Sequence, residues 1–286
     1  MPGGGVTSFA EDAAGNLWIG TQEGICRYDG TSIVRFGESD GLPLLNDRRS
    51  PAPPGGGNVF ADKDQNIWAN MLSGVFRWQD DRFVRFDIPF DRDLIKSHGI
   101  VPGNASLALE DRDGNKWFTV DGFGALRFDG SKFTQFTKQD GLCSNNVNDI
   151  LQDKQGNIWF ACMQSHQPKQ TGDGGLCRFD GRVFETFEDL KGLHHNDIYT
   201  IGMERNGSIW IGATGVGVYR YNGKTFVLFD KTDRMDLTWS LGLQAFHQAR
   251  DETVWLGFSG GLFRVHGNSL INVDRNGPWD SVGVAK

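Results

Sequence analysis

Short hydrophobic runs, separated by polar turns rich in glycine, recur along the whole chain. The plainest copy spans residues 111–130 and reads DRDGNKWFTVDGFGALRFDG. A polar turn leads into an apolar run with Trp117, and a glycine pair then separates this run from a second one, which ends at Asp129-Gly130. Runs this short, bounded by turn residues, predict β-strands joined as a meander. No segment of useful length shows the period of a helix.

The repeat is marked by tryptophans that recur every 40 to 50 residues or so: Trp18, Trp68, Trp117, Trp159, Trp210 and Trp255. Six residues before each stands Asp12, Asp62, Asp111, Asp153, Glu204 or, in the last copy, Ala249. A period of this length built of short strands is typical of propeller blades, because one four-stranded sheet cannot bury both of its faces alone. The pattern predicts an all-β chain, a six-bladed β-propeller of four-stranded antiparallel blades.

The predicted blades form a single β-propeller domain over residues 1–286. Their approximate bounds are 6–47, 58–90, 105–140, 147–190, 198–232 and 243–276. In an up-and-down blade, the connection from the second to the third strand and the connection to the next blade emerge at the same end. All the long, irregular segments fall in these connections, and binding residues tend to lie on such loops over a rigid scaffold. This end of the blades is therefore the candidate functional face.

The turns before the tryptophans contain repeated acids whose role needs a separate argument. The run from Asp111 to Asn115 superficially resembles a calcium-binding loop, but it has the wrong length and lacks the distal glutamate. Its repetition in five blades indicates turn chemistry instead. The arginine of each third strand is predicted to pair with a turn acid or an aromatic face for the same reason.

Charge and hydropathy exclude some partners. A formal net charge of -7 and a pI near 5.4 disfavour nucleic acid, which needs a concentrated basic face. No apolar stretch approaches the length of a membrane span, and Met1 is followed by Pro-Gly-Gly-Gly, which is not a signal sequence. We expect a soluble chain, cytoplasmic as it stands or an excised part of an exported protein. Its oligomeric state is left open.

The four cysteines predict free thiols. Cys26 and Cys177 occupy the same strand position in blades one and four, which a six-bladed ring places on opposite sides, beyond disulfide distance. A disulfide framework is therefore not expected, and reduced thiols are.

The repeat resembles a known family. Asp-x-x-Gly-Asn-x-Trp, then Gly-x-x-Arg-(Tyr/Phe)-Asp-Gly, then Asp-Gly-Leu before the next blade, is similar to the two-component regulator propeller repeat, and it covers essentially the whole chain. Trp117-Phe118-Thr119 is more weakly similar to a strand of streptogramin lyase-type propellers. The regulator resemblance implies a sensor module that is fused to a kinase in its usual setting.

Residues able to bind a metal gather on the long connections. The main candidates are His98, His166, His194 and His195, with Asp149, Asp197, Cys143 and Cys162 as weaker ones. Imidazole, thiolate and carboxylate groups are ligands of zinc-like divalent metals, so a metal cofactor of this kind is one hypothesis. Solvated loop histidines are the alternative. No motif indicates a nucleotide or an organic cofactor.

Asp149 is the one ionisable residue at its repeat position, where the other blades have Ser8, Asn58, Leu107, Thr200 and Ala245. A mixture of small and polar residues suits a partly wet central channel. Two readings stay open: Asp149 is a carboxylate at the channel mouth, or it is a water-bound structural acid.

Two functions follow from these residues. The first is a metal-dependent hydrolase of a small ester, lactone or phosphotriester at the histidine-bearing face, with a metal that polarises the substrate and activates water. The alternative is a non-catalytic, ligand-sensing module that binds through Asn145, Asn196 and Trp239. In both cases the partner is a small molecule. The regulator resemblance implies the sensor, but the gathering of histidines on one face favours the hydrolase, which is the function expected from the sequence.

Overall fold

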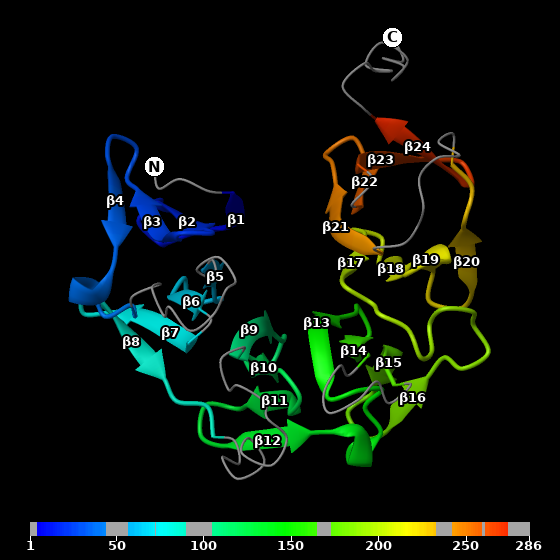
Figure 1. The fold of residues 1–286 in the computed structure, drawn as a ribbon, viewed down its shortest axis with the longest axis horizontal. Coiled ribbons are helices and arrows are strands. Elements are labelled where there is room, and N and C mark those ends of the chain that lie inside the picture. The colour runs from blue at the N-terminus through cyan, green and yellow to red at the C-terminus, as the bar shows by residue number, and fades with distance from the viewer. Residues whose placement is uncertain are drawn as a thin grey trace. The chain divides into compact units, whose positions relative to one another are not determined.

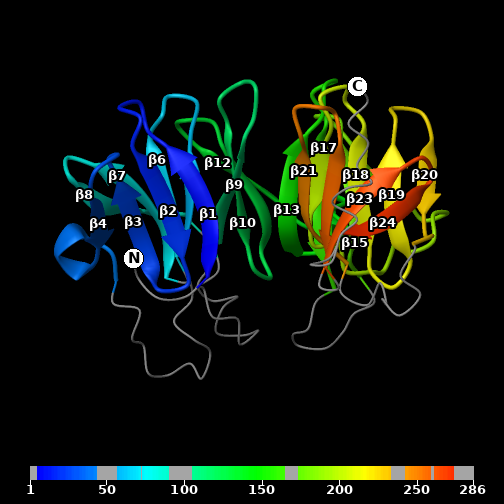
Figure 2. The same cartoon turned by 90° about the horizontal axis from the view of Figure 1, so that it is seen from above.

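The computed structural model describes residues 5–43, 57–71, 73–89, 105–164, 173–232, 242–258 and 261–273. Over these residues the chain forms 24 strands and two short 3-10 helices, η1 and η2. The strands make six four-stranded sheets, and each sheet takes its strands in chain order. All pairings within the sheets are antiparallel, as the up-and-down strands of Figure 2 show. The all-β prediction of six four-stranded antiparallel blades is confirmed.

The chain divides into two compact units, Met1–Gln135 and Phe136–Lys286. The first unit has three blades, drawn from blue to green in Figure 1. Blade one is β1 (Val6–Glu11), β2 (Leu17–Thr21), β3 (Gly24–Tyr28) and β4 (Ile33–Phe36), followed by η1 (Glu38–Asp40). Blade two is β5 (Asn58–Ala61), β6 (Ile67–Met71), β7 (Gly74–Gln79) and β8 (Arg82–Phe86). Blade three is β9 (Ala105–Glu110), β10 (Lys116–Val120), β11 (Gly124–Phe128) and β12 (Phe133–Phe136), whose last residue opens the second unit.

The second unit begins with η2 (Lys138–Asp140) and contains the other three blades. Blade four is β13 (Asn146–Gln152), β14 (Ile158–Met163), β15 (Gly175–Phe179) and β16 (Phe184–Thr186). Blade five is β17 (Ile201–Met203), β18 (Ile209–Ala213), β19 (Gly217–Tyr221) and β20 (Phe226–Phe229). Blade six is β21 (Leu243–Gln248), β22 (Val254–Phe258), β23 (Gly261–His266) and β24 (Ser269–Val273). The prediction of one domain over the whole chain stays a prediction.

A three-residue unit, here called the staple, explains why the acid, the tryptophan and the arginine recur together. In blade two, the indole N–H of Trp68 donates to Asp62 Oδ2 at 2.9 Å, and the Arg77 guanidinium lies 5.6 Å from the Trp68 ring centroid. Asp62 also accepts from the backbone and side-chain N–H groups of Asn66. Burial alone would raise the pKa of Asp62, but these donors and the nearby Lys116 lower it below its usual value. Asp62 is therefore a structural group of its turn, as predicted.

The staple recurs in the first five blades. The indole-to-acid distances are 2.8 Å for Trp18–Asp12, Trp117–Asp111, Trp159–Asp153 and Trp210–Glu204. Arginines lie over the corresponding rings at 5.4 to 5.8 Å: Arg27, Arg127, Arg178 and Arg220. The predicted pairing of arginines with turn acids or aromatic faces is confirmed in these blades.

Blade six departs from this arrangement. Ala249 stands where the other blades have the acid, so no carboxylate is available at that position. The five stapled tryptophans are almost completely buried, whereas Trp255 is only partly buried. The repeat thus gives a fully buried tryptophan in five blades and a partly buried one in blade six.

Polar side chains join neighbouring blades within each unit at the start of their first strands. In the first unit, Val59 N donates to Ser8 Oγ at 2.7 Å, and Asn70 Oδ1 accepts from Leu107 N at 2.8 Å. In the second unit, Ile201 N donates to Asp149 Oδ2 at 3.1 Å. Each bond satisfies a backbone amide of the next blade, from a first-strand residue in Ser8 and Asp149 and from a second-strand residue in Asn70, so polar side chains of both strands join successive sheets.

Candidate functional site

The candidate site lies at one end of blade four. We define its connection end as the end where β14 finishes, β15 begins and the segments from the neighbouring blades arrive. Gly175, the first residue of β15, forms a bridge with His194, and Ile198 N donates to Cys162 O at 3.1 Å. Gly174 N donates to Cys143 O at 3.3 Å. The connections before and after blade four are thus both attached to this end of its sheet.

Strand register brings two cysteines onto one face of the blade. Cys177 of β15 is opposite Phe160 of β14, and Cys162 lies two residues further along β14. Because side chains alternate between the faces of a strand, Phe160, Cys162 and Cys177 share a face. The other face holds Trp159, Ala161 and Leu176, which pack with residues of blade five.

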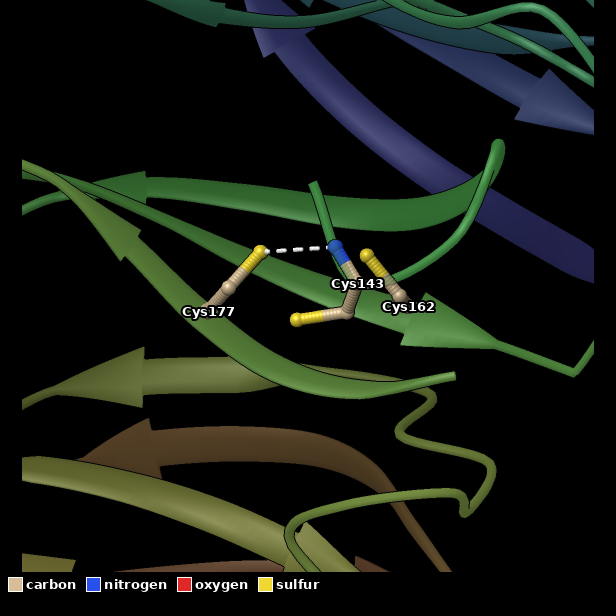
Figure 3. A group of neighbouring side chains, drawn as sticks. All are labelled: Cys143, Cys162 and Cys177. Atoms are coloured by element: carbon tan, nitrogen blue, oxygen red, sulfur yellow. Dashed lines mark hydrogen bonds between the residues drawn. The ribbon is translucent and has the colours of Figure 1, made fainter. Parts of the chain in front are cut away.

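The third cysteine comes from the connection before β13. The sulfur atoms of Cys143, Cys162 and Cys177 all lie within 4.8 Å of one another, and Figure 3 shows the three side chains together. Cys162 and Cys177 are fully buried, and Cys143 is partly exposed. All four cysteines of the chain are free thiols, which confirms that part of the prediction. Among the described residues, this trio is the one group of three or more potential metal ligands.

The three sulfurs have unequal proton affinities. Burial would raise the pKa of Cys177, but the thiols of Cys143 and Cys162 and the backbone N–H of Cys143 all donate to its sulfur and lower that pKa to about 5. The amide donor is 3.3 Å from the sulfur. Burial raises the pKa of Cys143 and of Cys162 well above the ordinary thiol value. These contacts favour the thiolate form at Cys177 over that at the other two cysteines.

The two adjacent histidines form a stacked pair. The rings of His194 and His195 have centroids 3.7 Å apart and an interplanar angle of 29°. His195 has a left-handed backbone with φ of 52°, and its carbonyl accepts from Gln164 Nε2 at 3.2 Å. His194 Nε2 lies 3.9 Å from Glu188 Oε1. The pair presents partly exposed imidazole faces at the connection end.

Asp149 has a structural role in this structure. Its Oδ2 accepts from Thr200 Oγ1 at 2.7 Å and from Ile201 N at 3.1 Å, and its Oδ1 accepts from Ile150 N at 2.9 Å. Burial nevertheless outweighs these three donors and raises its pKa. Of the two readings left open by the sequence, these contacts favour the structural acid.

The raised pKa of Asp149 predicts a pH effect on stability. Because the folded carboxyl holds its proton more tightly than the unfolded one, its contribution is fully present below the unfolded pKa of about 4 and is lost as the pH rises through the folded pKa. Urea unfolding of the wild type and of Asp149→Asn at a series of pH values should show the wild type losing stability relative to the variant as the pH rises. A difference that is constant, or that grows in favour of the wild type, contradicts this assignment.

The remaining described candidates are also engaged by the backbone. Asp197 Oδ1 accepts from Gln164 N at 2.7 Å. Asn145 Oδ1 accepts from Lys138 N at 2.9 Å. Asn196 Nδ2 donates to Gly192 O at 3.0 Å and to Thr214 O at 2.9 Å. Their proposed roles in binding stay predictions, as does that of Trp239, which lies outside the described residues together with His98 and His166.

The described histidines do not form a cage for the expected zinc-like metal; the described residues that could hold a metal are Cys143, Cys162 and Cys177. His194 and His195 stack on each other, and the described part of the chain brings no carboxylate into a ligand trio with them. The sequence candidates that do come together are Cys143 and Cys162, and they are joined by Cys177, which sequence reasoning treated only in relation to Cys26. The repeat register, which places positions 162 and 177 on one face, was the signal that could have found two of the three.

The fold and the six sheets define a β-propeller, and comparisons with known proteins agree. Residues 1–23 match the family model of the two-component regulator propeller, which confirms the resemblance read from the repeats. Residues 95–194 match the SMP-30/gluconolactonase/LRE-like region. No sequence among the curated proteins matches the chain.

Solved propellers resemble the chain in fold. The extracellular domain of the protein BT4673 from B. thetaiotaomicron is 16% identical with a TM-score of 0.71; the match covers 96% of this chain and 37% of that one. Virginiamycin B lyase from Staphylococcus aureus is 14% identical with a TM-score of 0.63, and the match covers 92% and 82% of the two chains. YCF48 bound to D1 peptide is 11% identical with a TM-score of 0.52, covering 93% and 81%.

The chain thus spans little more than a third of the length of the regulator structure that it matches. At these identities the likeness concerns the fold alone, and function has to be argued from the site. Within the described residues, no helix is long and apolar enough to cross a membrane.

Proposed function

We propose that the chain is a non-catalytic ligand-binding propeller module, and that a small molecule with a planar face binds at the connection end of blade four. The observation that carries the proposal is the stacked pair of His194 and His195, whose rings lie 3.7 Å apart at a partly exposed surface. Stacking on an aromatic face gives affinity without any metal or nucleophile. The match of residues 1–23 to the regulator propeller supports this reading.

The setting of the pair also suits binding. The backbone at His194 is paired with Gly175, and Gln164 contacts the carbonyl of His195, so the platform is attached to the ordered end of the sheet. A preorganised platform loses little conformational freedom when a ligand binds. Glu188, 3.9 Å from His194 Nε2, supplies a hydrogen-bond acceptor beside the ring for a polar group of the ligand.

A metal-dependent hydrolase is the second candidate. The match of residues 95–194 to the SMP-30/gluconolactonase/LRE-like region favours it, and its substrate would be a small ester, lactone or phosphotriester. The described histidines and carboxylates do not form a metal cage.

One experiment separates the two functions. The purified protein is titrated with a panel of nucleosides, aromatic carboxylates and phenyl glycosides, with its thermal midpoint and tryptophan fluorescence as readouts. The same preparation is assayed for hydrolysis of a lactone, a phenyl ester and a phosphotriester, with and without a chelator. We expect saturable binding of at least one planar compound, unaffected by chelator, and no hydrolysis.

The matched variants are His195→Ala and His266→Ala. Both residues are exposed, but His266 ends β23 in a hairpin of blade six. Loss of a stacking face should weaken binding by about tenfold or more in His195→Ala and leave His266→Ala unchanged. Equal binding by the two variants overturns the proposed platform. Hydrolysis that chelator abolishes and zinc restores overturns the non-catalytic function.

A further inference from the structure

We propose that Cys143, Cys162 and Cys177 form a three-coordinate site for a soft monovalent metal ion, Cu(I). The three sulfurs lie within 4.8 Å of one another. A trigonal ion with metal–sulfur bonds of about 2.3 Å needs sulfurs about 4 Å apart, so small side-chain rotations suffice to close the site. The inference does not rest on the proposed ligand-binding function, because it concerns different side chains.

The ligand set selects the class of metal. Thiolates are soft donors that favour Cu(I), zinc and iron–sulfur clusters over hard cations such as magnesium or calcium. Structural zinc sites are almost always four-coordinate, and iron–sulfur clusters are held by four protein ligands in most cases. Among the described residues, no histidine, cysteine or carboxylate joins the trio as a fourth ligand. Three sulfur ligands suit a d10 monovalent ion, which accepts trigonal coordination.

The surroundings of the sulfurs are those of a ligand site. Cys143 N donates to Cys177 Sγ at 3.3 Å, and the backbone of Ser144 makes a second such contact to the Cys162 sulfur. A backbone N–H that donates to a sulfur stabilises negative charge on it, and hydrogen bonds to ligand sulfurs tune a metal site. Cys162 and Cys177 are fully buried, which would shield the ion from water and oxidants.

Access to the site is provided by Cys143. It is the one partly exposed member of the trio, and it lies on the connection before β13 and not within a strand. A metal ion could be transferred first to this sulfur and then to the two buried ones. Metal binding releases the protons of the thiols that coordinate as thiolates.

The test is a competition for Cu(I) against a chromophoric chelator, bathocuproine disulfonate, under anaerobic reducing conditions. The wild type should remove one equivalent of Cu(I) and gain ultraviolet thiolate-to-copper absorption, and X-ray absorption should show three sulfur neighbours. Cys143→Ser, a change at a partly exposed position that should fold, is expected to bind at least about 100-fold more weakly. Cys177→Ala removes a different one of the three ligands and should weaken Cu(I) binding in the same way.

The matched control is Cys26→Ser, which changes a buried free cysteine of the first unit, remote in sequence from the trio. It should bind Cu(I) as the wild type does, and circular dichroism should confirm that every variant is folded. Wild-type affinity in folded Cys143→Ser and Cys177→Ala overturns the site. Stoichiometric Zn(II) that Cu(I) does not displace overturns the assignment of the metal.

Discussion

Trp159→Ala is expected to lower the free energy of unfolding by about 3 to 5 kcal/mol, the range for removing a buried tryptophan side chain. Trp159 is completely buried. Its ring stacks on Phe187 with centroids 5.4 Å apart and an interplanar angle of 4°, and it lies 5.3 Å from Tyr221. The indole joins blade four to residues of blade five, so its loss leaves a cavity in the second unit.

The same substitution also removes a hydrogen-bond donor from a buried carboxylate. Trp159 Nε1 donates to Asp153 Oδ2 at 2.8 Å, and Asp153 is 3% exposed. Trp159→Phe deletes this donor and keeps most of the ring. It should lower the free energy of unfolding by about 1 to 3 kcal/mol. The difference between the two variants measures the packing contribution alone.

The measurement is urea unfolding followed by circular dichroism, with Trp255→Ala as the matched control. Trp255 occupies the same repeat position but is only partly buried, in the blade where Ala249 replaces the acid. Trp255→Ala should therefore lower the free energy of unfolding clearly less than Trp159→Ala does. Equal costs for the two variants would show that burial and the staple do not determine the contribution of these tryptophans.

Gly212→Ala is expected to destabilise the protein by about 3 kcal/mol, the upper part of the range for overpacking. A Cβ atom at Gly212 would lie 2.3 Å from Leu243 Cβ and 2.6 Å from Leu243 N. The first strand of blade six would have to move, because one of these atoms belongs to its backbone. The effect should appear as a lower urea midpoint for unfolding of the protein.

Gly257→Ala is the matched control for this substitution. Gly257 has the same position relative to its tryptophan, but a Cβ atom there would meet Ala245 Cβ at 3.2 Å, a contact that a backbone shift of a few tenths of an ångström relieves. Its cost should be well under that of Gly212→Ala. A larger loss of stability in Gly257→Ala than in Gly212→Ala would contradict the close approach of Leu243 to β18.

The unequal roles of these two glycines show where sequence reasoning ends. Both follow a tryptophan by two residues in the same motif, so the repeat treats them alike. Ala161, Thr119 and Asn70 fill the same position in other blades. How much room a side chain has there depends on the neighbouring blade, which lies about one repeat away in the chain.

The candidate site shows the same limit. The sequence placed His194, His195, Cys143 and Cys162 at one end of the blades, because that end follows from antiparallel strand order. It did not reveal that the histidines stack or that Cys177 joins the other two cysteines. Connections between blades have no repeat, so their side-chain contacts cannot be inferred from the pattern of the strands.

The sequence by itself determined the six sheets, their strand order and the staple, because each depends on contacts within one repeat. The bond between Trp68 and Asp62, six residues apart, is of this local kind. The tertiary structure alone decided what Asp149 and the three cysteines do. Thr200, 51 residues beyond Asp149, donates to its carboxylate, and Cys143 approaches Cys177 across 34 residues. Contacts of this range arise when separate sheets and connections pack together, and no local periodicity encodes them.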